Sequence, residues 1–200
     1  MSPAERTARR EPVATAPIHR LRRRTTAVFL GGMGLGSIGL TAAIIASSLV
    51  AREISQSATW SGLPGAMSIL GTAAGTTLLA EAMQRWGRRR GLVSAYSLAV
   101  LGALVATAAV LIESLPLFIT GMFIIGVGRS GDALGRYLVA DLYPVGRRAT
   151  AIGWLIWMGT VGAVIGPNSL DPASRAASAL GMPPLAGACL VALCAYAVGA

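Results

Sequence analysis

Three charged residues, Arg129, Asp132 and Arg136, lie in a stretch of mostly small and apolar residues, GRSGDALGRYLVADLYP, which covers residues 128–144. On an α-helix, their spacings of three and four residues place them within an arc of about 60°, so that Asp132 can meet both arginines. The surplus arginine can bind an anionic group of a solute, and the Asp132 carboxyl group can exchange a proton. The same residues could instead form a structural ion cluster that holds helices together.

The residues around these charges are those of a membrane protein. Hydrophobic residues make up 54% of the 200-residue chain and charged residues 12%, with a mean hydropathy of +0.65. An ionised side chain at the centre of a membrane helix costs about 2.5–3.5 kcal/mol, so three uncompensated charges would cost on the order of 8–10 kcal/mol. We therefore expect the three side chains to point away from lipid, into an interior that several helices share.

The net charge of +9 does not indicate a nucleic-acid-binding protein. All 17 basic residues are arginines, seven of them lie in the first 24 residues, and aromatic residues do not alternate with them. Clusters of this kind are typical of segments that orient a protein in a bilayer. We predict that residues 1–24 form a disordered basic tail near anionic headgroups, and we expect no nucleic-acid partner.

Six apolar stretches have about the length that a bilayer requires. They cover residues 27–50, 61–82, 92–112, 115–140, 149–170 and 184–200. Of the connecting arginines, seven lie in the N-terminal tail, four at 84–90 and two at 144–148, whereas the other connections hold only Arg52 and Arg175. The positive-inside rule then places the N-terminus in the cytoplasm. The sequence predicts an all-α, polytopic membrane protein in which residues 25–200 form one bundle of six transmembrane helices.

The last apolar stretch reaches Ala200 after about 17 residues, which is barely enough to cross a bilayer. No polar residues flank it. We therefore expect the chain to be part of a longer protein.

Glycines are expected to let these helices approach one another closely. A seam of small residues beside the charged face contains Gly121, Gly128 and Gly135. Gly34, Gly36 and Gly39 have the GxGxxG spacing of a dinucleotide-binding turn, but neither a strand before them nor a soluble amphipathic helix after them is indicated. We interpret them as packing residues and predict that the chain binds no cofactor.

The sequence does not indicate an enzyme. The one histidine, His19, lies in the basic tail, and no arrangement of serine, histidine and acid or of paired acids is present. Cys189 and Cys194 are five residues apart, so a helix would point them about 140° away from each other. We predict neither a catalytic site nor a metal site. A catalytic pair that faces one cavity would be needed for the alternative, a membrane-embedded enzyme.

The connection at residues 80–90, AEAMQRWGRRR, resembles the loop between helices two and three of the major facilitator superfamily, whose signature is G-x-x-x-D-R-x-G-R-R. Four residues match it: Arg85, Gly87, Arg88 and Arg89. Ala80 and Gln84 stand where the family has Gly and Asp, which puts the family's charge relay in doubt here. The resemblance extends over residues 25–200 and corresponds to the N-terminal half of such a transporter.

Two further segments are similar to signatures of the same family. GAVIGPN, residues 162–168, resembles the G-x-x-x-G-P motif of helix five that is associated with antiporters, with Gly162, Gly166 and Pro167 as matches. VADLYPVGRRATAIG, residues 139–153, resembles the cytoplasmic loop after helix four, in which Asp141 and Arg147 or Arg148 would form a latch. The arginine that antiporters often carry in helix four falls on Met122, which does not support proton antiport by that route.

The resemblance implies a secondary transporter of the plasma membrane that moves a small solute by rocking one six-helix bundle against another. Arg129, Asp132, Arg136 and Asn168 would line the solute or proton pathway, and the matched glycines, arginines and Pro167 would act in gating. The partners implied are the lipid bilayer, a solute, a proton or ion gradient, and a second half or second copy that completes the pathway. The alternative is a membrane scaffold or degenerate half-transporter that moves nothing and whose charges are structural.

Overall fold

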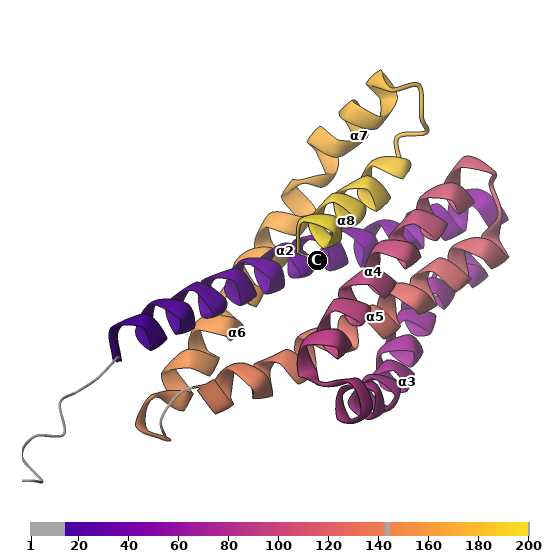
Figure 1. Ribbon diagram of the computed structural model, residues 1–200. Coiled ribbons are helices and arrows are strands. Elements are labelled where there is room, and N and C mark those ends of the chain that lie inside the picture. The colour runs from indigo at the N-terminus through magenta and orange to yellow at the C-terminus, as the bar shows by residue number, and fades with distance from the viewer. Residues whose placement is uncertain (1–14, 143–144, 200) are drawn as a thin grey trace, which may run out of the picture.

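The computed structural model describes residues 15–142 and 145–199, and the side chains of residues 31–135, 146 and 148–198 apart from Met33. Within these residues the chain consists of helices and short connections and contains no strand (Figure 1). The helices are α2 Thr15–Ser55, η1 Ala58–Trp60, α3 Leu63–Trp86, α4 Arg88–Leu111, α5 Leu115–Leu142, α6 Val145–Asn168, α7 Leu170–Ala179 and α8 Ala186–Gly199.

Five segments of the described helices are long and apolar enough to cross a membrane. They are Gly34–Ser55, Ala58–Trp86, Arg88–Leu111, Leu115–Gly135 and Arg148–Asn168, and Ala186–Val198 forms a shorter apolar helix. These segments confirm the predicted fold class, an all-α polytopic membrane protein. Each of the first five apolar stretches expected from the sequence lies within or overlaps one of the five helices α2 to α6.

Short connections separate the helices at residues that cannot continue them. Pro64 stands in the first turn of α3, where its missing N–H is not needed. Gly87 ends α3 and begins α4 with φ of 86° and ψ of 156°, a conformation open essentially to glycine alone. Glu113, with φ of 52°, reverses the chain between α4 and α5. Because these turns are short, α3, α4 and α5 run antiparallel to their neighbours in the chain (Figure 1).

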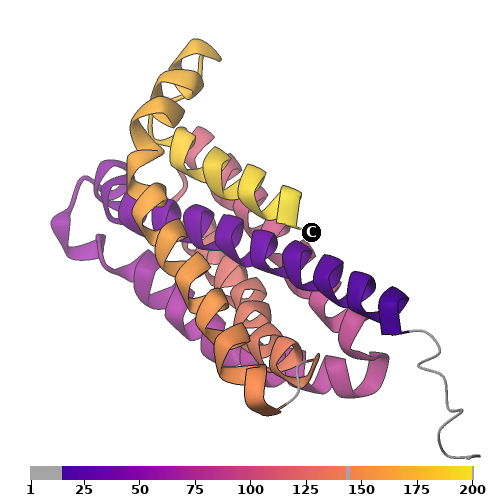
Figure 2. The same cartoon turned by 90° about the vertical axis from the view of Figure 1, so that its left-hand side faces the viewer.

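The helices form two groups, α3 with α4 and α5, and α2 with α6 and α8, which meet chiefly where α8 packs on α4. Helix α5 packs between α3 and α4, while α2 packs between α6 and α8, and α8 also packs against α4. Figure 2 shows α2 flanked by α6 on one side and α8 on the other. Segments far apart in the sequence therefore meet at the centre of the molecule.

The glycine seam of α5 packs against α4, as the sequence predicts. A Cβ added at Gly121 would lie 2.7 Å from the Ala106 nitrogen, and one added at Gly128 would lie 2.6 Å from the Ala95 carbonyl oxygen. Side chains at these positions would push the two helices apart. Close approach through small residues is the usual way in which membrane helices gain packing energy.

Glycines of α2 and α6 make similar contacts. A Cβ at Gly39 would lie 2.9 Å from the Cα of Ala192 on α8, and one at Gly162 would lie 2.7 Å from the carbonyl oxygen of Gly34. A Cβ at Gly166 would lie 2.9 Å from the Ile38 carbonyl oxygen. The interpretation of the α2 glycines as packing residues is thus consistent with where they lie.

The region before the last apolar helix differs from the expectation of a polar turn. Residues 170–179 form helix α7, which continues outward from α6 after a break at Ser169 (Figure 1). Alanines favour a helix here, and Asp171 in its first turn interacts favourably with the helix dipole. The chain reverses only after Gly181, which has φ of 73°.

The N-terminal region also differs from the expected disordered tail over residues 1–24. Helix α2 begins at Thr15, so residues 15–24 are helical, while residues 1–14 lie outside the described part of the chain. The sequence from Arg20 to Thr26 contains leucine and four arginines, which are good helix formers, and it leads directly into the first apolar stretch.

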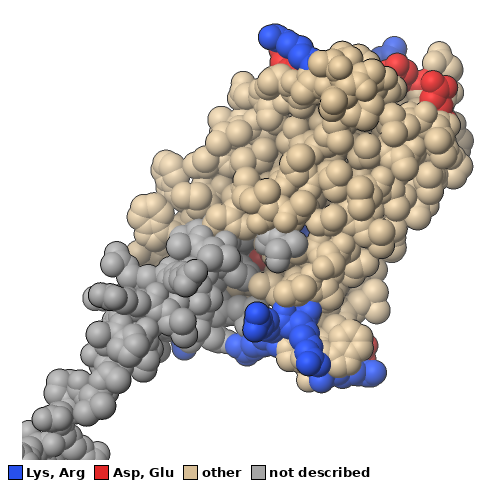
Figure 3. Space-filling model, turned by 45° about the horizontal axis from the view of Figure 1, so that its top comes forward, with Lys and Arg blue, Asp and Glu red and all other residues tan. Residues whose placement is uncertain are grey.

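Charged side chains gather at the two ends of the bundle. Figure 3 shows basic side chains at one end, a mixture of acidic and basic ones at the other, and an uncharged surface between them. The exposed arginines of the first end include Arg85, Arg88, Arg89, Arg90 and Arg148. This distribution is typical of a protein whose uncharged band lies in lipid.

Candidate functional site

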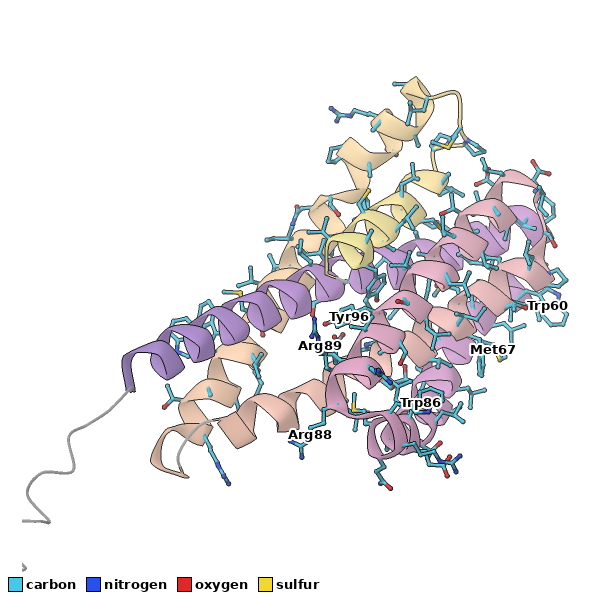
Figure 4. The ribbon with its side chains drawn as sticks, viewed as in Figure 1. Trp60, Met67, Trp86, Arg88, Arg89 and Tyr96 are labelled. Atoms are coloured by element: carbon cyan, nitrogen blue, oxygen red, sulfur yellow. The ribbon has the colours of Figure 1, made fainter. Side chains whose placement is uncertain are left out.

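Asp132, on α5, lies in the interior of the bundle and is partly buried. Its Oδ1 atom accepts a hydrogen bond from the Tyr96 hydroxyl on α4, with an oxygen–oxygen distance of 2.9 Å. In Figure 4, Tyr96 lies on the side of α4 that faces α2 and α8. The hydrogen bond therefore links two helices through a carboxyl group at the centre of the fold.

A second tyrosine approaches the same carboxyl group from α8. Tyr196 is 1% exposed. The Tyr196 hydroxyl is buried and makes no hydrogen bond within the described part of the chain.

Helix α2 contributes a glycine to the surroundings of the Asp132 carboxyl group. A Cβ added at Gly36 would lie 3.7 Å from Asp132 Oδ2 and 3.6 Å from the Cε1 atom of Tyr196. The absence of a side chain at Gly36 lets α2 pass beside the carboxyl group. We call the set Gly36, Tyr96, Arg129, Asp132 and Tyr196 the Asp132 cluster.

The Asp132 cluster shows how a carboxyl group is accommodated in an apolar bundle. A hydrogen bond to a charged group contributes about 1.5–3 kcal/mol, which offsets much of the cost of removing the carboxylate from water. The low dielectric of a protein interior strengthens such a bond further. The hydrogen bond from Tyr96 therefore offsets part of the free-energy cost of burying the Asp132 carboxylate.

Two of the residues expected in the pathway, Arg129 and Asp132, lie in this cluster. Arg129 and Asp132 are both partly buried on α5, one turn apart. Arg136 follows one turn later on the same helix, and its side chain lies outside the described set. Asn168 is exposed at the end of α6, where its Nδ2 atom donates a hydrogen bond of 2.8 Å to the Val164 carbonyl oxygen.

Tyr96, Tyr196 and Gly36 are the members of the cluster that sequence reasoning missed as functional candidates. A tyrosine inside an apolar helix is itself a signal, because its buried hydroxyl group needs a partner. The sequence does not reveal which partner, since the three residues come from three different helices. Gly36 was expected only as a packing residue.

The basic connection between α3 and α4 lies at the arginine-rich end of the bundle. Gly87 makes the sharp turn, with φ of 86°. Arg85 and Glu81 form an ion pair of 3.6 Å, but their side chains are 72% and 67% exposed. Arg88 and Arg89, the first two residues of α4, are exposed and are seen at this turn in Figure 4. Exposed ion pairs of this kind contribute little to stability.

The remaining gating candidates lie on α5 and α6. Gly162 and Gly166 let α6 pack closely on α2, and Pro167 stands in the last turn of α6. Arg148 is exposed in the first turn of α6. The side chains of Asp141 and Arg147 lie outside the described set, so the latch between Asp141 and an arginine stays a prediction.

Comparison with known proteins agrees with this architecture. Residues 17–168 match the family described as Major Facilitator Superfamily. The chain is 31% identical over 180 residues to the uncharacterized MFS-type transporter YddS of Bacillus subtilis, which covers 90% of this chain and 41% of the relative. It is 32% identical over 176 residues to the uncharacterized MFS-type transporter YdeG of the same organism, with 88% and 41% covered.

A third relative has a named substrate. The riboflavin transporter RfnT of Brucella anthropi is 26% identical over 146 residues, which cover 73% of this chain and 37% of that protein. No solved structure shows a significant match. The chain spans about 40% of the length of these curated relatives. The match over residues 17–168, together with the bundle of apolar helices, shows that the chain belongs to the major facilitator superfamily.

Proposed function

We propose that the chain forms one six-helix half of a secondary transporter that moves a small solute across the membrane by alternating access. Membership of the superfamily supports a role in membrane transport. The observation that carries the proposal is the Asp132 cluster, because ionisable groups in the interior of membrane helices usually mark a substrate or ion pathway.

Arg129, Asp132, Arg136 and Asn168 are the residues that we assign to the pathway. Arg129 and Arg136 would attract an anionic group of the solute, and the Asp132 carboxyl group would exchange a proton or contact a cationic group. Partial exposure of both Arg129 and Asp132 supports access from the aqueous phase. A proton or ion gradient is the driving force that this chemistry suits, in antiport or efflux.

The second half of the pathway would come from another six-helix bundle, either a further segment or a second copy of this chain. Helix α6 has an exposed apolar face on which Trp154 and Trp157 are 58% and 68% exposed. These two residues border an apolar hollow of about 420 Å³. An aromatic, concave face of this kind suits contact with a partner bundle as well as with lipid.

Gating would involve the two helix ends at the arginine-rich side. We assign Arg85, Gly87, Arg88 and Arg89 to the connection between α3 and α4, and Asp141 with Arg148 to the latch beside α6. Gly162, Gly166 and Pro167 would give α6 a pliable contact with α2. The arginine distribution supports a plasma-membrane protein with its N-terminus in the cytoplasm.

Flux in proteoliposomes tests this proposal. The chain is reconstituted with the segment encoded after residue 200 where the gene continues, and uptake is measured for riboflavin first and then for a panel of organic anions and cations. Arg129→Ala and Asp132→Asn should each lower flux about tenfold or more, the effect of losing one charged hydrogen bond.

Matched controls lie at the opposite end of the bundle from the arginine-rich turn. Arg175→Ala and Glu113→Gln remove exposed charges there and should leave flux within about twofold. Flux that is unaffected by Arg129→Ala and Asp132→Asn would favour the alternative, a scaffold whose charges only hold helices together.

A further inference from the structure

The turn between α3 and α4 carries more positive charge than its acidic residues balance. Residues 81–90 contain four arginines and a single acidic residue, Glu81, which pairs with Arg85. Arg89 and Arg90 are exposed and form no ion pair with a described residue. The first turn of α4 contains no acidic residue, and the positive end of the helix dipole adds to the charge of its arginines. An anionic partner would therefore be attracted to this turn.

An exposed and mostly apolar stripe begins one turn after these arginines and follows one face of α4. Val93 lies four residues after Arg89 and three after Arg90, so it is a neighbour of both on the helix surface. The exposed positions between residues 91 and 111 then recur at the helical repeat, within an arc of about 80°. They are Val93, Ser97, Leu101, Leu104, Ala108 and Leu111. The valine and the three leucines are each about half exposed.

Helix geometry sorts the three arginines of this turn by direction. At about 100° per residue, Arg90 lies within the arc of the stripe and Arg89 lies beside it. Arg88 points to the opposite side of α4. One face of α4 therefore has guanidinium groups at its end and apolar side chains along its length. We call Arg89, Arg90 and the six exposed residues of the stripe the α4 outer face.

The arginines of the α4 outer face lie where a bilayer has its headgroups. One apolar span ends at Trp86 and the next begins at Arg88. Trp86 is exposed beside them, and tryptophan is enriched at membrane interfaces (Figure 4). The charged side chains of this end border an uncharged surface (Figure 3). From Arg90 to Leu101 the helix rises by about 17 Å, close to half of the roughly 30 Å hydrocarbon core. The α4 outer face thus matches the length of a phospholipid in one leaflet.

We propose that the α4 outer face binds an anionic phospholipid, with its phosphate group at Arg89 and Arg90 and an acyl chain along the apolar stripe. Guanidinium groups bind phosphate through charge-assisted hydrogen bonds. The positive charge favours an anionic lipid over a zwitterionic one, because the ammonium group of the latter is repelled. The apolar stripe favours a lipid over a free phosphate ion, which gains nothing from contact with it. The site does not depend on the proposed transport.

Quenching of a single tryptophan by brominated lipids tests this site. Leu101→Trp places the reporter in the stripe, and phenylalanine replaces the four native tryptophans of the full chain. The protein is reconstituted with brominated phosphatidylcholine, which should quench the reporter because it faces lipid. Mixtures of phosphatidylcholine with brominated phosphatidylglycerol then give the relative binding constant of the anionic lipid. We expect this constant to favour phosphatidylglycerol about fivefold or more, since each arginine near the headgroups contributes about that factor.

Variants of the turn locate the headgroup. Arg90→Gln should lower the relative binding constant about fivefold, and Arg90→Lys should keep most of it because the charge remains. Arg88→Gln is the matched control. It removes the same charge from the opposite side of α4, about a Debye length away from the lipid phosphate, and should leave the constant within about twofold.

Three results would overturn the site. The first is equal binding of phosphatidylglycerol and phosphatidylcholine by the protein without turn substitutions. The second is an equal loss in Arg88→Gln and Arg90→Gln, which would show diffuse attraction to the whole turn. The third is loss of the preference in excess inorganic phosphate, which would show that the arginines bind a free anion and not a lipid. A preference that survives excess phosphate and depends on Arg90 supports the lipid site.

Discussion

Tyr96 on α4 donates a hydrogen bond of 2.9 Å to Asp132 on α5, and the two residues are 36 positions apart in the chain. This bond joins two helices that approach each other closely through glycine and alanine. It gives the α4–α5 pair one directional contact among many non-directional ones. A bond of this kind determines the rotational position of each helix, which dispersion between small residues specifies only weakly.

Tyr96→Phe should lower the free energy of unfolding by about 1 kcal/mol, because Asp132 loses a donor in a region of low dielectric. Tyr196→Phe is the matched control. It removes a hydroxyl group that makes no hydrogen bond to any described residue, so it should leave the free energy of unfolding unchanged or raise it slightly. Denaturant titration in detergent micelles measures both. Equal losses in the two variants would contradict the assignment of the hydrogen bond.

Gly39→Ala should lower the free energy of unfolding by about 1–3 kcal/mol, since the new Cβ would lie 2.9 Å from Ala192 and force α8 away from α2. Gly36→Ala on the same helix is the control. Its Cβ would meet its nearest neighbours at 3.6 and 3.7 Å, which is ordinary van der Waals contact, so the fold should tolerate it. A larger loss for Gly36→Ala than for Gly39→Ala in thermal unfolding would refute the packing.

Gly87→Ala should destabilise the protein by about 1–3 kcal/mol, because φ of 86° with ψ of 156° is strained for any residue with a side chain. Gly146→Ala provides a comparison at the next connection on the same side of the bundle. Among the described residues that are not its chain neighbours, no atom lies within 4 Å of its added Cβ, so alanine should be neutral or stabilising there. Thermal melting of both variants in one detergent checks the difference, and similar melting temperatures would contradict it.

Glu81→Gln should change the free energy of unfolding by less than about 0.5 kcal/mol, because the pair with Arg85 is exposed and screened by solvent. A matched measurement at high salt should give the same small difference. A loss of several kcal/mol would show that the connection between α3 and α4 holds a stronger charge relay than the exposed pair indicates.

The helices and two residues of the Asp132 cluster could be predicted from the sequence, because each of these features depends on a local pattern of residues. Apolar length predicts α3 to α6, and the spacing of Arg129 and Asp132 places them on one helix face whatever surrounds them. Gly121 and Gly128 were predicted as a seam for the same reason, since their spacing alone puts them on one side of α5.

The features that the sequence did not predict depend on how the helices are arranged in space. Tyr96, Asp132 and Tyr196 come together only because α8 packs on α4, although 74 residues separate the end of α4 from the start of α8. Helix α7 was missed because its polar composition resembles a turn, whereas the continuation of α6 past Ser169 provides a helical start. Asn168 was grouped with the pathway from its motif, while its amide group bonds to its own helix.

The neighbouring positions of α4 and α5 bear on how the protein is made. These helices follow each other directly in the chain and have the Tyr96–Asp132 bond between them, so they can leave the translocon as a pair with that hydrogen bond already formed. The ribosome delivers α8 only later, when the carboxyl group is already engaged. The Tyr96–Asp132 hydrogen bond can therefore form before α8 leaves the ribosome.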